Sequence, residues 1–389
     1  VLEAGDGVGG RVRTDVVDGL RLDRGFQLLN PSYPEAARVL DLDALDLRTL
    51  APGVVVALEG RRRARLGDPR RRPAWATDAL STATGSLASK SRFARYAWHA
   101  VRTSVPDLLA GPDFSAEVAL RSTGIDDALL DRVLRPFLSG VFLEPDLATS
   151  RRFLDLVLRS FMRATPAVPA TGMQAIPDQL HAALPPGSVR LNVPVAAVTG
   201  STVSAAGMDF TADAVIVATD PRTATSLTGV PAPTGNAVTT WYHLAPVPTG
   251  AITNGDAILV VDGLRRGPVM NTVAMTNAAP EYASGGRTLI ASSVLGAADT
   301  VDDERRIRTH LALLYGEDTG DWEPVRAYRI PYALPAMLPP LDVRKPVALG
   351  DGLFIAGDHR DTASIQGAMV SGRRAADAAL RHLGFTPIS

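Results

Sequence analysis

Residues 352–358 read Gly-Leu-Phe-Ile-Ala-Gly-Asp, and residues 363–373 read Ala-Ser-Ile-Gln-Gly-Ala-Met-Val-Ser-Gly-Arg. The apolar run before Gly357 predicts a short strand, and the segment after Ser364 predicts a helix. The first backbone N–H groups of a helix lack partners within it and lie at the positive end of its dipole, which suits a phosphate or an electron-rich ring edge. Asp358 ends the strand, where open α/β sheets bind ligands. Taken alone, the stretch also fits an ordinary strand–loop–helix unit in which Asp358 only caps a turn.

The composition of the chain excludes several classes of protein. The 389 residues are 46% hydrophobic and 21% charged with a net charge of −1, so nothing favours nucleic acid or an anionic membrane. The sequence has no cysteine, and its six histidines form no i,i+4 pair, so we expect no disulfide and no metal site. No apolar run approaches the ~20 residues of a membrane span. We therefore expect a small-molecule partner, no nucleic acid and no integral membrane segment. We expect a cytoplasmic location, with peripheral membrane contact as an alternative, and the oligomeric state stays open.

The N-terminus contains a literal G-x-G-x-x-G at Gly5, Gly7 and Gly10. A dinucleotide-binding loop of this kind follows a full strand and opens a helix. Here only a few residues precede it, and the alternating residues 11–23, with an Asp-Gly turn, predict a hairpin. We therefore interpret Glu3 instead as the acidic residue that ends the second strand of a βαβ unit and binds ribose hydroxyls. A surface strand end is the alternative. The first interpretation predicts that a strand, the true glycine loop and a helix, roughly 30 residues, lie upstream.

The remaining pattern predicts two insertions between three α/β segments. Residues 74–165 are predicted to be helical, and residues 236–335 to form a mostly antiparallel sheet with one helix. The strand over residues 214–219 is expected to be buried on both faces because it is an unbroken apolar run. The other expected elements are helices over residues 33–40 and 172–184, strands over 54–58 and 189–198, and a hairpin around 209–211.

Two local patterns imitate functional motifs. The Arg-rich residues 61–65 and 70–72 have no interleaved aromatic residues, so we interpret them as a solvated hairpin and loop rather than a nucleic-acid patch. His359-Arg360-Asp361 imitates a kinase catalytic loop, but Gln366 stands where that loop requires Asn.

The order of these pieces resembles the flavin-containing amine oxidase and phytoene-desaturase-like FAD oxidoreductases over nearly the whole chain, minus their first βα unit. The matching pieces are Leu2-Glu3-Ala4, Gly9-Gly10-Arg11, residues 23–27, Gly172-Met173, Pro194-Val195, residues 214–219 with Pro221, Gly357-Asp358 and residues 364–372.

The resemblance implies an α/β fold with a discontinuous Rossmann-like (GR2-type) FAD-binding domain and a substrate domain with a mostly antiparallel sheet and a helical insertion. The implied FAD-binding domain comprises residues 1–66, 166–225 and 341–389. The helical insertion would span residues 67–165 and the substrate domain residues 226–340.

The resemblance also implies the residues that hold FAD. Glu3 would bind the adenosine ribose, Gly9 and Gly10 would let the backbone approach, and Arg11 would neutralise pyrophosphate charge. Asp358 would accept from the ribityl chain or orient a phosphate-bound water, and the Ile365 N–H would face the flavin N1–C2=O edge. Arg24, Gly25, Phe26, Gln27 and Leu28 would run beside the isoalloxazine, and Val195 would bond the adenine through its backbone. The other implied cofactor-binding residues are Ala4, Ala218, Gly357, Ser364 and Ala368.

The chemistry implied is hydride transfer from a substrate C–H or C–N bond to flavin N5, as in a desaturase or an oxidase. Ser364 stands where one aromatic wall of an amine cage would be, and neither Lys90 nor Lys345 lies in a strand of the middle domain. These departures favour a large apolar substrate over an amine, and catalytic residues stay unassigned. A non-catalytic member is the alternative. The missing glycine loop predicts weaker FAD binding than in a version extended upstream. Trp241-Tyr242-His243 would either line the substrate pocket or pack in the core.

Overall fold

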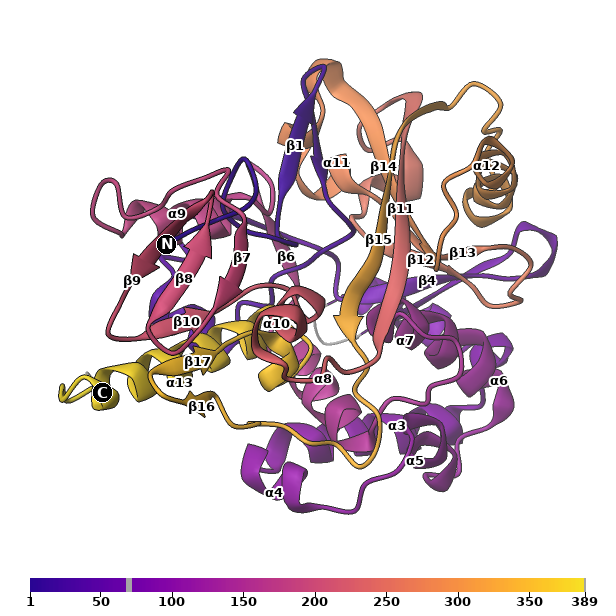
Figure 1. Cartoon of the computed structure of the whole chain (residues 1–389). Helices are drawn as coiled ribbons and strands as arrows, with labels where there is room; N and C mark the ends of the chain where they lie inside the picture. Colours follow the sequence, from indigo (N-terminus) through magenta and orange to yellow (C-terminus); the bar gives the residue numbers. More distant parts are fainter. Residues whose placement is uncertain (68–71, 388–389) are drawn as a thin grey trace.

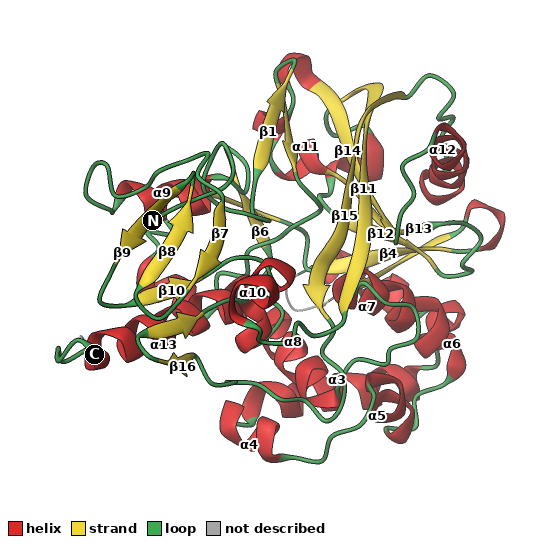
Figure 2. Ribbon diagram, viewed as in Figure 1, coloured by secondary structure: helices red, strands yellow, loops and turns green. Residues whose placement is uncertain are grey.

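The computed structural model describes residues 1–67 and 72–387, which form a seven-stranded sheet, two three-stranded sheets, two two-stranded sheets and the helices around them (Figures 1 and 2). The larger sheet has seven strands, and all its neighbouring strands are antiparallel except β12 and β4. Its order is β15 (Glu323–Pro335), β11 (Gly235–Pro248), β14 (Arg287–Leu295), β13 (Val269–Ala274), β12 (Leu259–Asp262), β4 (Gly53–Ala57) and β5 (Arg63–Gly67). The mostly antiparallel substrate-domain sheet is thereby confirmed.

Successive side chains of a strand point to opposite faces of the sheet, and on the inner strand β11 they enter two different buried cores. On β11, Trp241 packs in a core with α12 (Val301–Tyr315), whereas Tyr242 packs in a second core with the N-terminal hairpin. That hairpin joins β1 (Thr14–Val17) and β2 (Leu20–Asp23) through Asp18-Gly19, both with positive φ, as predicted. The second of these cores attaches the N-terminal hairpin to the sheet.

One three-stranded sheet contains the parallel pair β10 (Val215–Val217) and β17 (Leu353–Ile355), with β16 (Ala348–Gly350) antiparallel to β17. The predicted C-terminal helix is α13 (Ile365–His382), and α10 (Pro221–Thr228) follows β10. Figure 1 shows both helices beside these strands. The other elements of this part are α1 (Pro34–Val39), α9 (Ala175–Ala182), the paired β3 (Leu47–Thr49) and β6 (Ala167–Pro169), and the antiparallel β7 (Val195–Val198), β8 (Thr202–Ala205) and β9 (Met208–Thr211).

The chain is helical between strands β5 and β6, as predicted. A π-helical turn, Leu130–Leu134, precedes Pro136, whose missing N–H cannot continue the α-helical ladder. The helices are α2 (Ala76–Ala79), α3 (Leu87–Arg102), α4 (Val105–Ala110), α5 (Ala116–Ser122), α6 (Asp127–Leu129), α7 (Arg135–Phe142) and α8 (Arg151–Arg163), and α11 (Met275–Ala278) follows β13.

Two expectations about strands are wrong. The strand expected over residues 189–198 covers only β7, because Asn192 has φ +57° and Pro194 has no N–H. Ile216 of β10 is 42% exposed, so β10 is not buried on both faces; among the described residues it pairs only with β17. The segment assigned to the first domain as residues 1–66 includes β4 and most of β5, which belong to the larger sheet.

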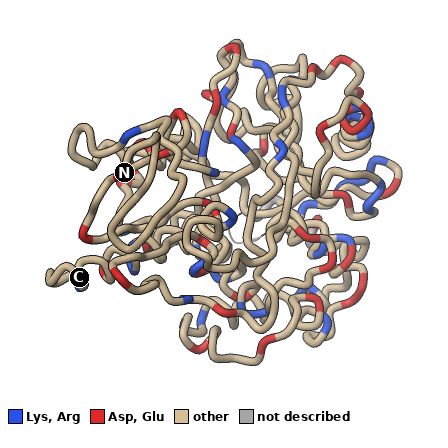
Figure 3. The backbone as a smooth tube through the Cα atoms, in the orientation of Figure 1, with Lys and Arg blue, Asp and Glu red and all other residues tan. Residues whose placement is uncertain are grey.

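Basic and acidic residues are interspersed along the chain in Figure 3. The Arg-rich hairpin β4–β5 forms as expected, and Arg63 Nε donates to the carbonyl of Leu314 at the end of α12. Residues 70 and 71 of the second Arg-rich run lie outside the described residues. Among the described residues, none of the helices has both the length and the apolar character that a bilayer crossing requires.

Candidate functional site

The candidate site lies where the parallel strands β10 and β17 end. Parallel strands have their carboxyl ends at the same edge, so Ala218 after β10 and Gly357-Asp358 after β17 lie at one edge of the sheet. The helices α10 and α13 begin at this edge. Ala218 is exposed there, whereas Asp358 is only 4% exposed.

An ion pair joins this edge to the N-terminal loop. Arg11 Nη2 lies 2.7 Å from Asp358 Oδ1, and Arg11 Nη1 donates to the Ala333 carbonyl of β15 at 2.7 Å. The Arg11 side chain keeps 31% of its surface exposed, so it can still face a ligand. The structure therefore brings together two residues that the sequence assigned to separate parts of a cofactor.

The start of α13 presents unpaired donors. Ser364 caps the helix: its Oγ accepts from the Gly367 N–H at 2.9 Å, and its carbonyl accepts from the Ala368 N–H at 3.0 Å. The Ile365 and Gln366 N–H groups have no hydrogen-bond partner among the described residues. These are the donors that a helix end offers to an anion or a ring edge.

The segment at residues 25–28 shares a buried core with the start of α13. Phe26, Leu28 and Ile365 pack against one buried core. Gly25 has φ +104°, a backbone conformation that L side chains rarely adopt, so this position favours glycine. The Arg24 side chain pairs with Asp15, and its Nη2 lies 2.8 Å from Asp15 Oδ1.

Two glutamine side chains hold the glycine loop at residues 8–11. Gln27 Nε2 donates to the Arg11 carbonyl at 2.6 Å, and Gln174 Nε2 donates to the Val8 carbonyl at 3.0 Å. Gly9 has φ +117°, and a Cβ there would lie 2.3 Å from the Val12 carbonyl oxygen. The buried Oε1 atoms of both glutamines have no partner in the described part of the chain. Sequence reasoning missed Gln174, although it follows the matched Gly172-Met173.

Gly10 differs from its neighbour Gly9. It has φ +58° and is exposed, and a Cβ there would meet no atom within 4 Å. The loop is therefore sterically constrained at Gly9 and open at Gly10.

The buried Asp23 carboxylate accepts hydrogen bonds from three separate segments near the loop. It is 1% exposed and accepts from the Thr14 hydroxyl at 2.5 Å, the Met173 N–H at 2.9 Å and the Tyr282 hydroxyl at 2.8 Å. Its backbone carbonyl accepts from the Tyr242 hydroxyl. Burial raises the pKa of Asp23 to about 6, against the opposing effect of these three hydrogen bonds.

Glu3, which the resemblance places at the adenosine ribose, pairs through its backbone with residues 190–193. The Glu3 N–H donates to the Arg190 carbonyl, and the Val193 N–H donates to the Glu3 carbonyl, each at 2.9 Å. Glu3 Oε1 also accepts from the Gly5 N–H at 2.7 Å. This pairing brings Glu3 and the exposed Ala4 near the start of β7, because Val195 follows Val193 by two residues.

Three further residues occupy the strand-end edge, and sequence reasoning missed all of them. The Arg222 guanidinium lies 5.4 Å from the centre of the Tyr332 ring, and burial raises the pKa of Tyr332 to about 12. His359 follows Asp358 and is 2% exposed with both ring nitrogens unpartnered among the described residues; burial lowers its pKa to about 4. His359 carried a usable signal, since it is a histidine directly after Gly-Asp.

The aromatic run on β11 packs in the core, which is one of the two alternatives that the sequence left open for it. Trp241, Tyr242 and His243 are all buried, and the His243 ring lies 3.3 Å from Glu304 Oε1. Lys90 lies on α3 and Lys345 on the segment between β15 and β16, so neither belongs to the larger sheet.

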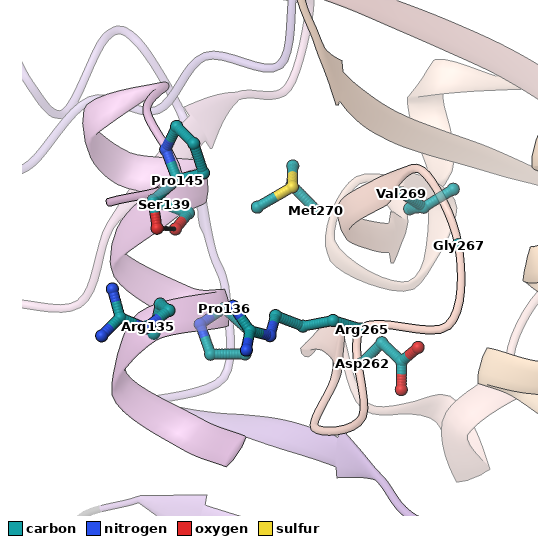
Figure 4. A pocket seen from close by; sticks show the side chains of 9 residues that line it. All are labelled: Arg135, Pro136, Ser139, Pro145, Asp262, Arg265, Gly267, Val269 and Met270. Carbon is teal, nitrogen blue, oxygen red and sulfur yellow. Dashed lines mark hydrogen bonds between the residues drawn. The ribbon is translucent and has the colours of Figure 1, made fainter. Parts of the chain in front are cut away.

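A cavity of about 110 Å³ lies elsewhere, between α7 and the β12–β13 turn (Figure 4). Cofactor pockets typically measure ~300–1,000 Å³, so this cavity is too small for a flavin. None of the sequence-predicted site residues lines it; its walls are Arg135, Pro136, Ser139, Pro145, Asp262, Arg265, Gly267, Val269 and Met270.

Comparisons with known proteins agree with this architecture. An oxidoreductase from Methanosarcina mazei has a TM-score of 0.70 at 15% identity, over 97% of this chain and 93% of that chain. A putrescine oxidase variant has a TM-score of 0.69 at 19% identity, over 98% of this chain and 93% of that chain. A reduced UDP-galactopyranose mutase has a TM-score of 0.69 at 15% identity, over 98% of this chain and 89% of that chain. These similarities show the fold alone, because the same fold serves different reactions. No curated protein matches the sequence.

The family comparison goes further than the fold. The model of the flavin containing amine oxidoreductases matches residues 1–380, which is nearly the whole chain. The α/β fold with a Rossmann-like domain and a substrate domain is thereby confirmed, as is a flavin-dependent oxidoreductase. The chain belongs to the flavin-containing amine oxidoreductase family.

Proposed function

We propose that this protein is an FAD-dependent oxidoreductase that takes a hydride from a C–H bond of an apolar or weakly basic substrate. The observation that carries the proposal is the unpaired Ile365 and Gln366 N–H groups at the edge where Arg11 meets Asp358. A helix start with free donors stabilises negative charge, and reduced flavin carries such charge on its pyrimidine ring.

The residues at this edge fit a dinucleotide cofactor. Glu3, with Ala4 and Val195, would hold the adenosine end, and the segment Gly9-Gly10-Arg11 would hold the pyrophosphate. The buried, unpartnered Oε1 of Gln27 is a further acceptor for which the described residues supply no donor. A buried unpaired acceptor costs about 1–3 kcal/mol, so a ligand donor there would be favourable.

The flavin end would be held by the remaining implied residues. These are Arg24, Gly25, Phe26 and Leu28, with Ala218, Gly357, Asp358, Ser364, Ile365 and Ala368.

When bound, FAD supplies the hydride acceptor at its N5 atom. The chain contributes orientation and electrostatics. The Ile365 N–H would stabilise developing negative charge, and the apolar Phe26 and Leu28 side chains would keep water away from the reacting face. The Arg11–Asp358 pair would hold the N-terminal loop against the start of α13.

We also propose a domain division that differs from the sequence expectation. Because β4 and β5 belong to the larger sheet, the first flavin-domain segment ends near residue 50. Residues 166–225 and 341–389 complete that domain, the helical layer precedes β6, and residues 226–340 with 53–67 form the substrate domain.

The proposed substrate class rests on what the site lacks. Ser364 caps α13 and supplies no aromatic wall for an amine. Lys90 and Lys345 lie outside the larger sheet, where a lysine near the flavin would be expected from the resemblance. Amines remain the second candidate, since the family is that of amine oxidoreductases and one similar structure is a putrescine oxidase.

The test is spectroscopic. Addition of the protein to FAD should quench flavin fluorescence and give a structured visible spectrum, and a spectrum identical to free FAD at saturating protein would refute the proposal. An apolar polyene and a diamine should then be added separately without oxygen. Loss of the visible flavin absorbance with the polyene supports the proposed substrate class, whereas loss with the diamine alone would establish amines instead.

A further inference from the structure

Arg13 lies under the turn that follows Glu3. Its side chain is 13% exposed, with Nη1 donating to the Gly7 carbonyl at 3.2 Å and Nη2 lying 3.0 Å from Asp6 Oδ1. A Cβ at Gly7 would lie 3.2 Å from Arg13 Cζ and Nη2, so the guanidinium packs directly against the backbone of the turn.

The other end of Arg13 is fixed to the hairpin. The Arg24 N–H donates to the Arg13 carbonyl at 2.8 Å, just beyond the paired strands β1 and β2. That hairpin is anchored through Asp23, which is buried. Arg13 therefore connects a rigid part of the fold to the turn at residues 5–7.

This turn needs an anchor of that kind. It contains Gly5 and Gly7, and glycine has the largest conformational freedom to lose when a loop becomes ordered. The turn also determines the Glu3 side chain, because Glu3 Oε1 accepts from the Gly5 N–H at 2.7 Å. Arg13 and Glu3 thus hold the turn from its two sides.

We propose that Arg13 is a positioning residue, which holds the turn at residues 5–7 so that the Glu3 carboxylate is presented to the adenosine ribose. The inference rests on the proposed FAD function and assigns a role to a residue that the motif comparison did not include. It acts through the Gly7 carbonyl rather than through contact with the cofactor.

The alternative explanation is a surface ion pair between Arg13 and Asp6. The Asp6 side chain is 75% exposed, and exposed pairs contribute little. Two variants separate the explanations. Asp6→Asn removes the ion pair but leaves the Gly7 hydrogen bond, whereas Arg13→Met keeps the length of the side chain and removes both.

The experiment measures binding of FAD, ADP and riboflavin to the three proteins by calorimetry. Arg13→Met should weaken FAD and ADP roughly tenfold, the scale of one lost charge-assisted hydrogen bond. Riboflavin lacks the adenosine, so its affinity should stay unchanged. Asp6→Asn should match the wild type for all three ligands.

Hydrogen exchange provides a readout that does not depend on the cofactor. The amides of residues 5–8 should exchange faster in Arg13→Met, with no change in α13. Equal ADP affinity and equal exchange in Arg13→Met and the wild type would overturn the inference. A wild-type protein that binds no FAD would instead refute the proposed function, and the exchange result would still decide the role of Arg13 in the turn.

Discussion

Asp23 gives the sharpest stability prediction, because a carboxylate only 1% exposed joins three separate segments. Burial raises its pKa to about 6 from the ordinary 3.8. The folded state therefore binds this proton more tightly than the unfolded state. The difference of about two pKa units corresponds to about 3 kcal/mol. This stabilisation is fully present below about pH 4 and is lost as the pH rises through about 6.

The variant Asp23→Asn isolates this effect. Asparagine keeps an acceptor for the Thr14 hydroxyl and the Met173 N–H, and the Tyr282 hydroxyl can rotate to accept from its amide. The free energy of unfolding of the wild type minus that of the variant should fall by about 3 kcal/mol between pH 4 and pH 7. Other titrating groups are common to both proteins and cancel in this difference.

The assay is urea unfolding followed by tryptophan fluorescence at a series of pH values. Asp18→Asn is the matched control, since Asp18 is exposed in the turn of the same hairpin and asparagine tolerates its positive φ. Its difference from the wild type should be flat across this range. A flat difference for Asp23→Asn, or one that grows with pH, would show that Asp23 does not carry the raised pKa.

Three other changes test the site. Arg11→Met leaves the Asp358 carboxylate buried without its cation and should lower the free energy of unfolding by about 2 kcal/mol, measured by thermal unfolding. The loss should be smaller than the roughly 3–5 kcal/mol of a fully buried pair, because Arg11 is partly exposed. Adding Asp358→Asn should recover part of the lost stability, and no recovery would contradict the pairing. Gly9→Ala should destabilise the protein by more than about 1 kcal/mol, because its Cβ would collide with the backbone at φ +117°. Gly10→Asn should be nearly neutral in the same thermal unfolding experiment, because a Cβ there meets no other atom. Equal effects of the two variants would argue against the loop geometry. Ser364→Ala removes the α13 cap and should cost about 1 kcal/mol, with Ser364→Thr close to the wild type in the same melting experiment; an unchanged Ser364→Ala would show that the cap is not formed.

Local elements could be predicted from the sequence where their pattern is self-contained. The Asp18-Gly19 turn and the start of α13 at Ser364 both depend on neighbours within a few residues, and both form as predicted. The strand at residues 189–198 failed for an equally local reason that the periodicity concealed. Pro194 and the positive φ of Asn192 limit it to β7.

Membership of a sheet could not be predicted in the same way. The hydrophobic run of β4 identifies a strand but not its partners, and its parallel pairing with β12 joins residues about two hundred positions apart. The exposure of Ile216 has the same origin, because an apolar run does not reveal whether another element covers its second face. Tertiary neighbours decide both features.

The ion pair between Arg11 and Asp358 shows how the same limit affects the site. Sequence reasoning placed both residues at the cofactor but gave each a separate role, because nothing in the pattern indicates contact between positions 347 residues apart. In the structure, the Asp358 carboxylate is buried and needs a cation, and Arg11 supplies it. The positive charge that Arg11 would offer a phosphate on the proposed function is therefore already compensated in part. On the proposed function, the free N–H groups of Ile365 and Gln366, which have no competing partner among the described residues, would therefore be the stronger source of positive potential for the cofactor.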